Sequence, residues 1–171
     1  MIAASSRREI EEQSYPLFLY ILVPLLAIGL QSFLALHFPR VAVLDLPLLV
    51  TIYFAITRRN PVIGTLTGTF IGLCQDALTH HPIGVNGISK AIIGYLAASL
   101  GVRIDTENHG TRLLLILAFA FLHSFMYLLI MHRLLGLELK WSWVQELIRA
   151  IADALVGVIL FALLDRAKKR A

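Results

Sequence analysis

The sequence predicts an all-α integral membrane protein, a bundle of about six transmembrane helices. Of its 171 residues, 58% belong to the hydrophobic set and 15% are charged, and the mean hydropathy is +0.78. Soluble domains usually contain about half apolar and about a quarter charged residues. We expect one transmembrane domain over residues 1–171, because too little polar sequence is left to cover a separate soluble core. The composition therefore excludes a large catalytic ectodomain.

The six spans are apolar runs bounded by proline, glycine or charged residues. They cover residues 17–38, 41–57, 62–78, 88–102, 113–131 and 144–164. Pro39 and Arg40 end the first span, the run 58–61 ends the second, and the polar stretch 103–112 follows the fourth. The middle spans are close to or below the roughly 17 residues needed to cross a bilayer core. A five-span arrangement, or one with a re-entrant pair, is therefore the alternative.

The distribution of basic residues predicts the orientation in the membrane. The run that starts at Leu17 is too long for the apolar region of a cleavable signal peptide and lacks a small-x-small site, so we expect it to remain as a span. If the N-terminus is cytoplasmic, ten basic residues lie on the cytoplasmic side and three on the outer side. Basic residues favour the cytoplasmic side, so both termini are predicted to be cytoplasmic. Topology thereby explains the net charge of +4 without nucleic-acid binding.

Ionisable residues fall within the predicted spans, where a charge at mid-bilayer costs on the order of 2.5–3.5 kcal/mol. They are Asp45, Asp76, Lys90, Glu146, Arg149 and Asp153, and the predicted orientation places all of them in the outer half of the membrane. For Asp45 and Lys90 we favour side chains near helix ends that extend to water. For Asp76, Arg149 and Asp153 we favour an inward-facing polar network, either structural or partner-binding.

The spacing of these residues suggests which of them pair. Glu146, Arg149 and Asp153 are three and four residues apart, so one helical face carries all three and Arg149 can pair with either acid. Asp76 lies near the end of the third span and Lys90 near the start of the fourth, across a short outer loop. That proximity in the sequence makes Asp76 and Lys90 candidate partners.

Small residues recur along the third span. Gly64, Gly68 and Gly72 are four residues apart, which places them on one face of a helix. Such glycine ridges let two helix backbones approach closely in a membrane. We interpret this ridge as an intramolecular packing surface, with a partner-facing interface as the alternative.

The loop of residues 79–87 connects the third and fourth spans. It contains Pro82, Gly84, Asn86 and Gly87, which are turn-forming residues. This composition predicts a tight re-entry into the fourth span and not a flexible linker.

The sequence offers no pattern for a metal site or an enzyme. His80 and His81 lie near Asp76, but adjacent histidines lack further ligands at the spacing that metal sites use. His123 is interpreted as a packed core histidine or a hydrogen bond between helices. The single cysteine, Cys74, excludes an internal disulfide. Phosphate-loop, zinc-protease and nucleophile-elbow motifs are missing, so we expect a non-enzyme without a cofactor.

Three segments in and after the third span form a further pattern. They are Gly72-Leu73-Cys74-Gln75-Asp76-Ala77-Leu78, Pro82-Ile83-Gly84-Val85-Asn86-Gly87 and Gly94-Tyr95-Leu96. With its Gly-Leu-x-x-Asp-x-Leu core, the glycine-containing loop and the Tyr-Leu pair, the chain resembles the bacterial rod shape-determining protein MreD family.

This resemblance implies a non-enzymatic protein of the bacterial inner membrane that helps to maintain rod shape. The implied mechanism is scaffolding in the complex that builds the lateral cell wall: the outer face of the bundle binds the MreC protein. Through MreC the implied partners are the MreB filament, the RodA glycosyltransferase and a class B penicillin-binding protein. The resemblance also implies spans arranged similarly to the substrate-binding subunits of energy-coupling factor vitamin transporters.

That similarity supplies a second functional hypothesis, a substrate-binding subunit of a vitamin transporter. Such a subunit needs a stripe of small residues on its first span to dock a coupling protein, and the span presents Ala27, Gln31 and Ala35 at that spacing. Gln31 interrupts the stripe, which counts against the transporter. A lipid-linked precursor flippase ranks third, because it needs a continuous polar path and the fifth span offers only His123.

Overall fold

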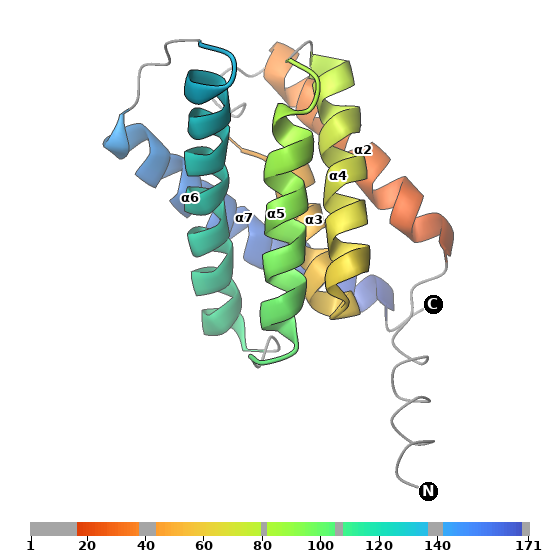
Figure 1. The fold of residues 1–171 in the computed structure, drawn as a ribbon. Helices are drawn as coiled ribbons and strands as arrows, with labels where there is room; N and C mark the ends of the chain where they lie inside the picture. Colours follow the sequence, from red (N-terminus) through yellow and green to blue (C-terminus); the bar gives the residue numbers. More distant parts are fainter. Residues whose placement is uncertain (1–16, 38–43, 80–81, 105–107, 137–141, 169–171) are drawn as a thin grey trace, which may run out of the picture.

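The computed structural model describes residues 17–37, 44–79, 82–104, 108–136 and 142–168. Within these ranges the chain forms six α-helices and no strand (Figure 1). The helices are α2 (Leu17–His37), α3 (Leu46–Arg58), α4 (Pro61–Thr79), α5 (Val85–Gly101), α6 (His109–Arg133) and α7 (Trp143–Lys168). The all-helical class predicted from the sequence is confirmed for this part of the chain.

Each predicted span corresponds to one helix, and most ends agree within a few residues. The second span differs most, because α3 starts at Leu46 and the prediction started at residue 41. Asp45 accepts a hydrogen bond from the backbone N–H of Leu48 at 3.0 Å and so caps the helix. Asp45 was placed inside a span by its apolar neighbours, whereas it precedes the helix.

The membrane character of the helices is supported in part. By length and hydropathy, two helical segments of the described chain can cross a bilayer, His109–Arg133 and Trp143–Ala167. Phe18–Leu34 and Leu46–Arg58 are apolar but shorter. The 13 residues of α3 extend only about 20 Å along the helix axis, less than the thickness of a hydrocarbon core.

The short helix α3 is the centre of the bundle. Every residue from Leu46 to Ile56 is buried, and α3 contacts each of the other five helices. A helix that is apolar on all sides is expected to be enclosed by other elements. The hydrophobic core combines residues of α3 with residues of all five surrounding helices, including Ile28, Ile71, Ile93, Ile116 and Phe161.

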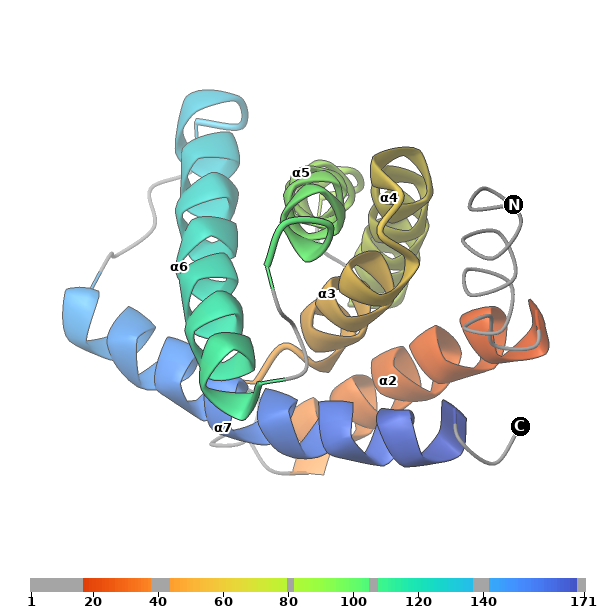
Figure 2. The ribbon, with the colours of Figure 1, turned by 90° about the horizontal axis from the view of Figure 1, so that it is seen from below.

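Successive helices from α3 to α7 run in opposite directions, so the bundle has two distinct ends. We call them the Asp45 end, where α3, α5 and α7 begin, and the Asp165 end, where these helices finish. In Figure 1 the Asp45 end is at the top and α4 and α5 stand nearly upright, whereas α6 is seen lengthwise in Figure 2 and is therefore tilted relative to them. Seen along the bundle in Figure 2, α2 and α7 run obliquely along one side of the other helices.

The glycine ridge of α4 packs against α5. A Cβ atom on Gly64, Gly68 or Gly72 would overlap backbone atoms of Gly94, Lys90 and Asn86, respectively. All three glycines are buried, and α4 and α5 form the most extensive helix pair of the bundle. The ridge therefore faces the interior of this chain and not a partner protein, and it fixes the position of Lys90 and Asn86 relative to α4.

Candidate functional site

The last part of α4 supplies a carboxylate to the first turn of α5. Asp76 is fully buried and accepts hydrogen bonds from the backbone N–H groups of Gly84 at 2.9 Å, Asn86 at 3.1 Å and Gly87 at 3.3 Å. It also accepts from Nδ2 of Asn86 at 2.7 Å. The first N–H groups of a helix lack partners within the helix, and the helix N-terminus carries partial positive charge. Asp76 therefore caps α5 from a neighbouring helix.

The loop before α5 has a backbone shape that this cap requires. Gly84 has a φ of +104°, a conformation that residues with a side chain rarely adopt. In this conformation the N–H groups of Gly84, Asn86 and Gly87 converge on the Asp76 carboxylate. The turn residues predicted for the loop therefore direct the first backbone N–H groups of α5 toward the Asp76 carboxylate of α4.

One turn further along α5, the ammonium group of Lys90 lies at the centre of a buried polar cluster. Its Nζ lies 2.8 Å from Oδ2 of Asp45, 3.3 Å from Oδ1 of Asn86 and 3.2 Å from Nε2 of His123. Lys90 is 0% exposed. An ammonium group has three protons to donate and no acceptor, so the three contacts match its full donor capacity. His123 Nε2 accepts in this arrangement, which leaves the ring proton on Nδ1.

Asp45 connects this cluster to the start of the central helix. Oδ1 caps α3 and Oδ2 accepts from Lys90, while the backbone N–H of Asp45 donates to Oδ1 of Asp153 at 2.9 Å. Asp153 is buried in α7. We call Asp45, Asn86, Lys90, His123 and Asp153 the Lys90 cluster; it joins the start of α3 to α5, α6 and α7.

The buried amide of Gln31 extends these contacts to α2. Its Oε1 accepts from the backbone N–H of Leu46 at 3.3 Å, and its Nε2 donates to the carbonyl of Leu44. The residue that interrupts the small-residue stripe of the first span is therefore a contact between helices. Ala27 and Gln31 are buried and face the bundle, so they are not available for docking a coupling protein.

The geometry corrects the predicted pairs. Lys90 pairs with Asp45 and not with Asp76; Lys90 is fully buried and Asp45 is half-buried, so this pair lies against the bundle instead of extending to water. Asp153 accepts from the backbone of Asp45 and not from Arg149.

Glu146 and Arg149 lie outside the Lys90 cluster. The side chain of Arg149 is 44% exposed, and its Nη1 lies 3.7 Å from Oε1 of Glu146, a contact at the limit of an ion pair. A long pair on one helix with an exposed arginine contributes little to stability. The predicted network on α7 is therefore reduced to Asp153.

The sequence analysis interpreted His123 as a packed core histidine or a hydrogen bond between helices, without a partner, and it treated Gln31 only as an interruption of the small-residue stripe. In both cases a detectable signal existed, because each is a polar residue within a long apolar run. Asn86 was assigned to the loop, whereas its side chain contacts both Asp76 and Lys90. His80 and His81 lie outside the described residues. In the part of the chain that the structure describes, no group of three His, Cys, Asp or Glu residues is placed to hold a metal ion.

A second set of polar contacts lies at the Asp165 end. Asp165 of α7 accepts a hydrogen bond from the hydroxyl of Tyr53 at 2.8 Å and forms an ion pair with Arg112 of α6 at 2.6 Å. The guanidinium of Arg58 lies over the ring of Tyr20 at 4.4 Å from its centroid. These contacts tie α3 to α6, α7 and α2, so both ends of the central helix are held by polar side chains.

A comparison with known families identifies a match over nearly the whole chain. The family model described as rod shape-determining protein MreD matches residues 11–166. The match includes every residue of the Lys90 cluster, Asp76 and the contacts at the Asp165 end. No curated protein and no solved structure matches the chain.

Proposed function

The chain belongs to the rod shape-determining protein MreD family, and on this basis we propose that it is a non-enzymatic scaffold of the complex that builds the lateral cell wall. Family membership implies a role in rod-shape determination. In the proposal, the protein lies in the bacterial inner membrane and binds an MreC-like protein. Through this partner it is connected to the MreB filament, the RodA glycosyltransferase and a class B penicillin-binding protein.

The observation that carries the proposal is the use of the buried polar side chains. The Asp76 carboxylate accepts hydrogen bonds from N–H groups at the start of α5, and the ammonium of Lys90 contacts Asp45, Asn86 and His123. These groups hold helices to one another, which gives the bundle one defined arrangement. A scaffold needs such a frame, because it must present its partner-binding surface in a fixed geometry.

The distribution of arginines supports the proposed orientation. At the Asp165 end, Arg58, Arg59, Arg103, Arg112 and Arg166 lie in or beside terminal turns of helices. The described residues of the Asp45 half contribute only Arg133 and Arg149 outside the buried cluster. By the positive-inside rule we place the Asp165 end and both termini in the cytoplasm. The Asp45 end then faces the periplasm, where the proposal places the MreC-like partner.

The exposed surfaces of the oblique helices also fit a membrane environment. The exposed large side chains of α2 include Ile21, Leu25 and Leu26, and those of α7 include Ile148 and Leu155. Large exposed apolar patches are rare on monomeric soluble proteins and mark contacts with lipid or with partner proteins. We propose that all six helices lie within the membrane, with the short α3 shielded by the other five.

The proposal is tested by identifying what copurifies with the tagged protein. The protein is expressed at its native level, extracted in mild detergent and compared with an unrelated tagged membrane protein by mass spectrometry. Recovery of an MreC-like protein with cell-wall synthases is the expected result. Recovery of paired ATPases with a membrane coupling protein would contradict the scaffold and establish the transporter subunit.

Site-specific photo-crosslinking then maps the partner. A photoreactive residue replaces Leu26 on α2 or Ile148 on α7, which are 62% and 58% exposed. The same residue at the buried position Ile93 is the matched control, because it faces the core of this chain. A crosslink to the MreC-like protein from an exposed position and none from Ile93 supports a direct contact.

A further inference from the structure

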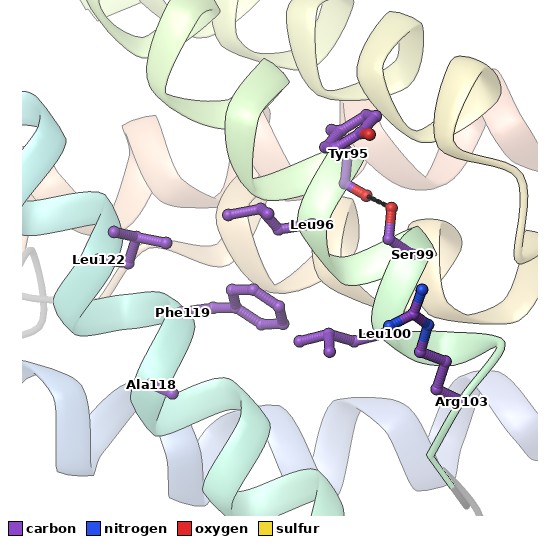
Figure 3. Close-up of a pocket in the computed structure, with 8 residues that line it drawn as sticks. All are labelled: Tyr95, Leu96, Ser99, Leu100, Arg103, Ala118, Phe119 and Leu122. Atoms are coloured by element: carbon purple, nitrogen blue, oxygen red, sulfur yellow. Dashed lines mark hydrogen bonds between the residues drawn. The ribbon is translucent and has the colours of Figure 1, made fainter.

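An open apolar groove lies between α5 and α6 on the flank of the bundle. It has a volume of about 420 Å³ and is shown in Figure 3. Leu96 and Leu100 of α5 form one wall, and Ala118, Phe119 and Leu122 of α6 form the other. The groove exists because α5 packs closely on the glycine ridge of α4 and much less extensively on α6.

One cationic side chain stands at the end of the groove that lies toward the Asp165 end. Arg103 lies two residues after the end of α5 and lines the groove together with Ser99 (Figure 3). Ser99 donates its hydroxyl proton to the carbonyl of Tyr95 at 2.8 Å, so this donor is already used. The guanidinium of Arg103 is thus the charged group that the groove offers to an occupant.

Arg103 differs from its neighbouring arginines in its contacts. Arg112 is paired with Asp165, and Arg58 lies over the ring of Tyr20. Arg103 is exposed and has no side-chain partner among the residues that the structure describes. In the proposed orientation it lies at the cytoplasmic end of its helix, where basic groups between transmembrane helices bind anionic lipid headgroups.

We propose that the α5–α6 groove binds an anionic phospholipid of the cytoplasmic leaflet. One acyl chain lies along Leu96, Leu100, Phe119 and Leu122, and the phosphate pairs with the guanidinium of Arg103. The apolar walls and the single cation at one end match the two parts of this ligand. A transmembrane helix of a partner protein would fill the apolar walls but leaves the charge of Arg103 without a counterpart. The inference rests on the membrane orientation in the proposed function and on no protein partner.

The test is native mass spectrometry of the purified full-length protein in detergent with added phosphatidylglycerol or phosphatidylcholine. Three variants are compared with the wild type. Arg103→Gln removes the cation, Ala118→Phe fills the groove from α6, and Arg166→Gln removes another exposed arginine of the same end as a matched control. Circular dichroism and thermal unfolding confirm that each variant is folded.

The wild type and Arg166→Gln are expected to retain phosphatidylglycerol in preference to phosphatidylcholine. Arg103→Gln should lower phosphatidylglycerol retention about fivefold, the effect of one basic group near an anionic lipid. Ala118→Phe should reduce retention of both lipids. Equal retention by the wild type and Arg103→Gln, or no preference of the wild type for phosphatidylglycerol, would overturn the proposal.

A photoreactive residue at Leu122 supplies a second readout in cells. A crosslink to phospholipid supports the proposal, and a crosslink to a partner helix overturns it. The lipid assay uses the purified chain alone, so its failure leaves copurification of the MreC-like protein unaffected. Conversely, the loss of that copurification in wild-type extracts would contradict the scaffold without changing lipid retention.

Discussion

Replacement of Lys90 by methionine tests whether the Lys90 cluster holds the bundle together. Methionine is similar in length to lysine and can occupy the same space between the helices, so the change removes the cation with little change in packing. It removes the ion pair with Asp45 and the contacts with Asn86 and His123. The three former partners are left in the interior without their common donor.

The size of the effect follows from these contacts. Polar contacts between transmembrane helices average about 0.6 kcal/mol each, and removing one partner of a buried ion pair costs about 3–5 kcal/mol. The Asp45 side chain is 16% exposed and keeps its bond to Leu48, so the lower end of this range applies. We expect Lys90→Met to lower the free energy of unfolding by about 3 kcal/mol, which corresponds to a decrease in Tm of roughly 6–12 °C for a chain of this size.

The assay is thermal and denaturant unfolding in detergent micelles, followed by circular dichroism. Asp45→Asn keeps the cap on α3 but removes the negative charge, and the double variant completes a thermodynamic cycle. We expect the double variant to be more stable than the sum of the single changes predicts, because it contains no unpaired buried charge. Arg149→Gln is the matched control and should change stability by less than about 1 kcal/mol, since the Arg149 side chain is exposed and its contact with Glu146 is long.

The reasoning would be refuted by a Lys90→Met variant as stable as the wild type. It would also be refuted by strictly additive effects of the two single substitutions, because additivity means that the two residues do not interact.

Further substitutions test the helix contacts one at a time. Gly68→Ala would place a methyl group against the backbone of α5 and should lower the unfolding temperature by several degrees. Gly29→Ala is the control: its new Cβ has no neighbour within 4 Å, so the unfolding temperature should stay unchanged or rise slightly. Equal unfolding temperatures of the two variants would show that the glycine ridge is unimportant. Asp76→Ala should destabilise the protein by about 2–4 kcal/mol, because several N–H groups at the start of α5 lose their acceptor. Amide hydrogen exchange should then increase first at residues 84–87. Unchanged exchange at these residues would contradict the capping role. Tyr53→Phe removes the hydrogen bond to Asp165 and should lower the free energy of unfolding by about 1 kcal/mol. If this decrease were larger than that for Asp76→Ala, the Asp165 end and not the Asp45 end would control stability.

Local sequence features predicted the helices well. Runs of apolar residues and the breaks at Arg58 to Pro61 and around Pro82 and Gly84 depend on neighbours in the chain, and the helix ends follow them closely. The start of α3 was missed, because Asp45 stands among apolar residues and only its hydrogen bond to Leu48 identifies it as a cap.

Part of the Lys90 cluster was predicted from the sequence, but its contacts between helices were not. Asp76, Lys90 and Asp153 were singled out because they are ionisable residues in apolar spans, but Lys90 was expected to extend to water and is instead buried. Their partners were assigned from sequence proximity and helical spacing, which suggested Asp76 for Lys90 and either Glu146 or Asp153 for Arg149; of these pairs the structure contains only the long contact of Arg149 with Glu146. The actual partner of Lys90 is 45 residues away, and His123 is 33 residues away.

The sequence by itself determined the helical class, the approximate bounds of the helices, the glycine ridge of α4 and the family. Each of these depends on residue type and on spacing within one segment. Only the tertiary structure decided that α3 is the enclosed central helix, that Asp45 and not Asp76 pairs with Lys90, and that a groove ending at Arg103 opens between α5 and α6. These features depend on the rotation of each helix about its axis and on the side chains that meet where helices cross, and both are set by packing between segments far apart in the chain.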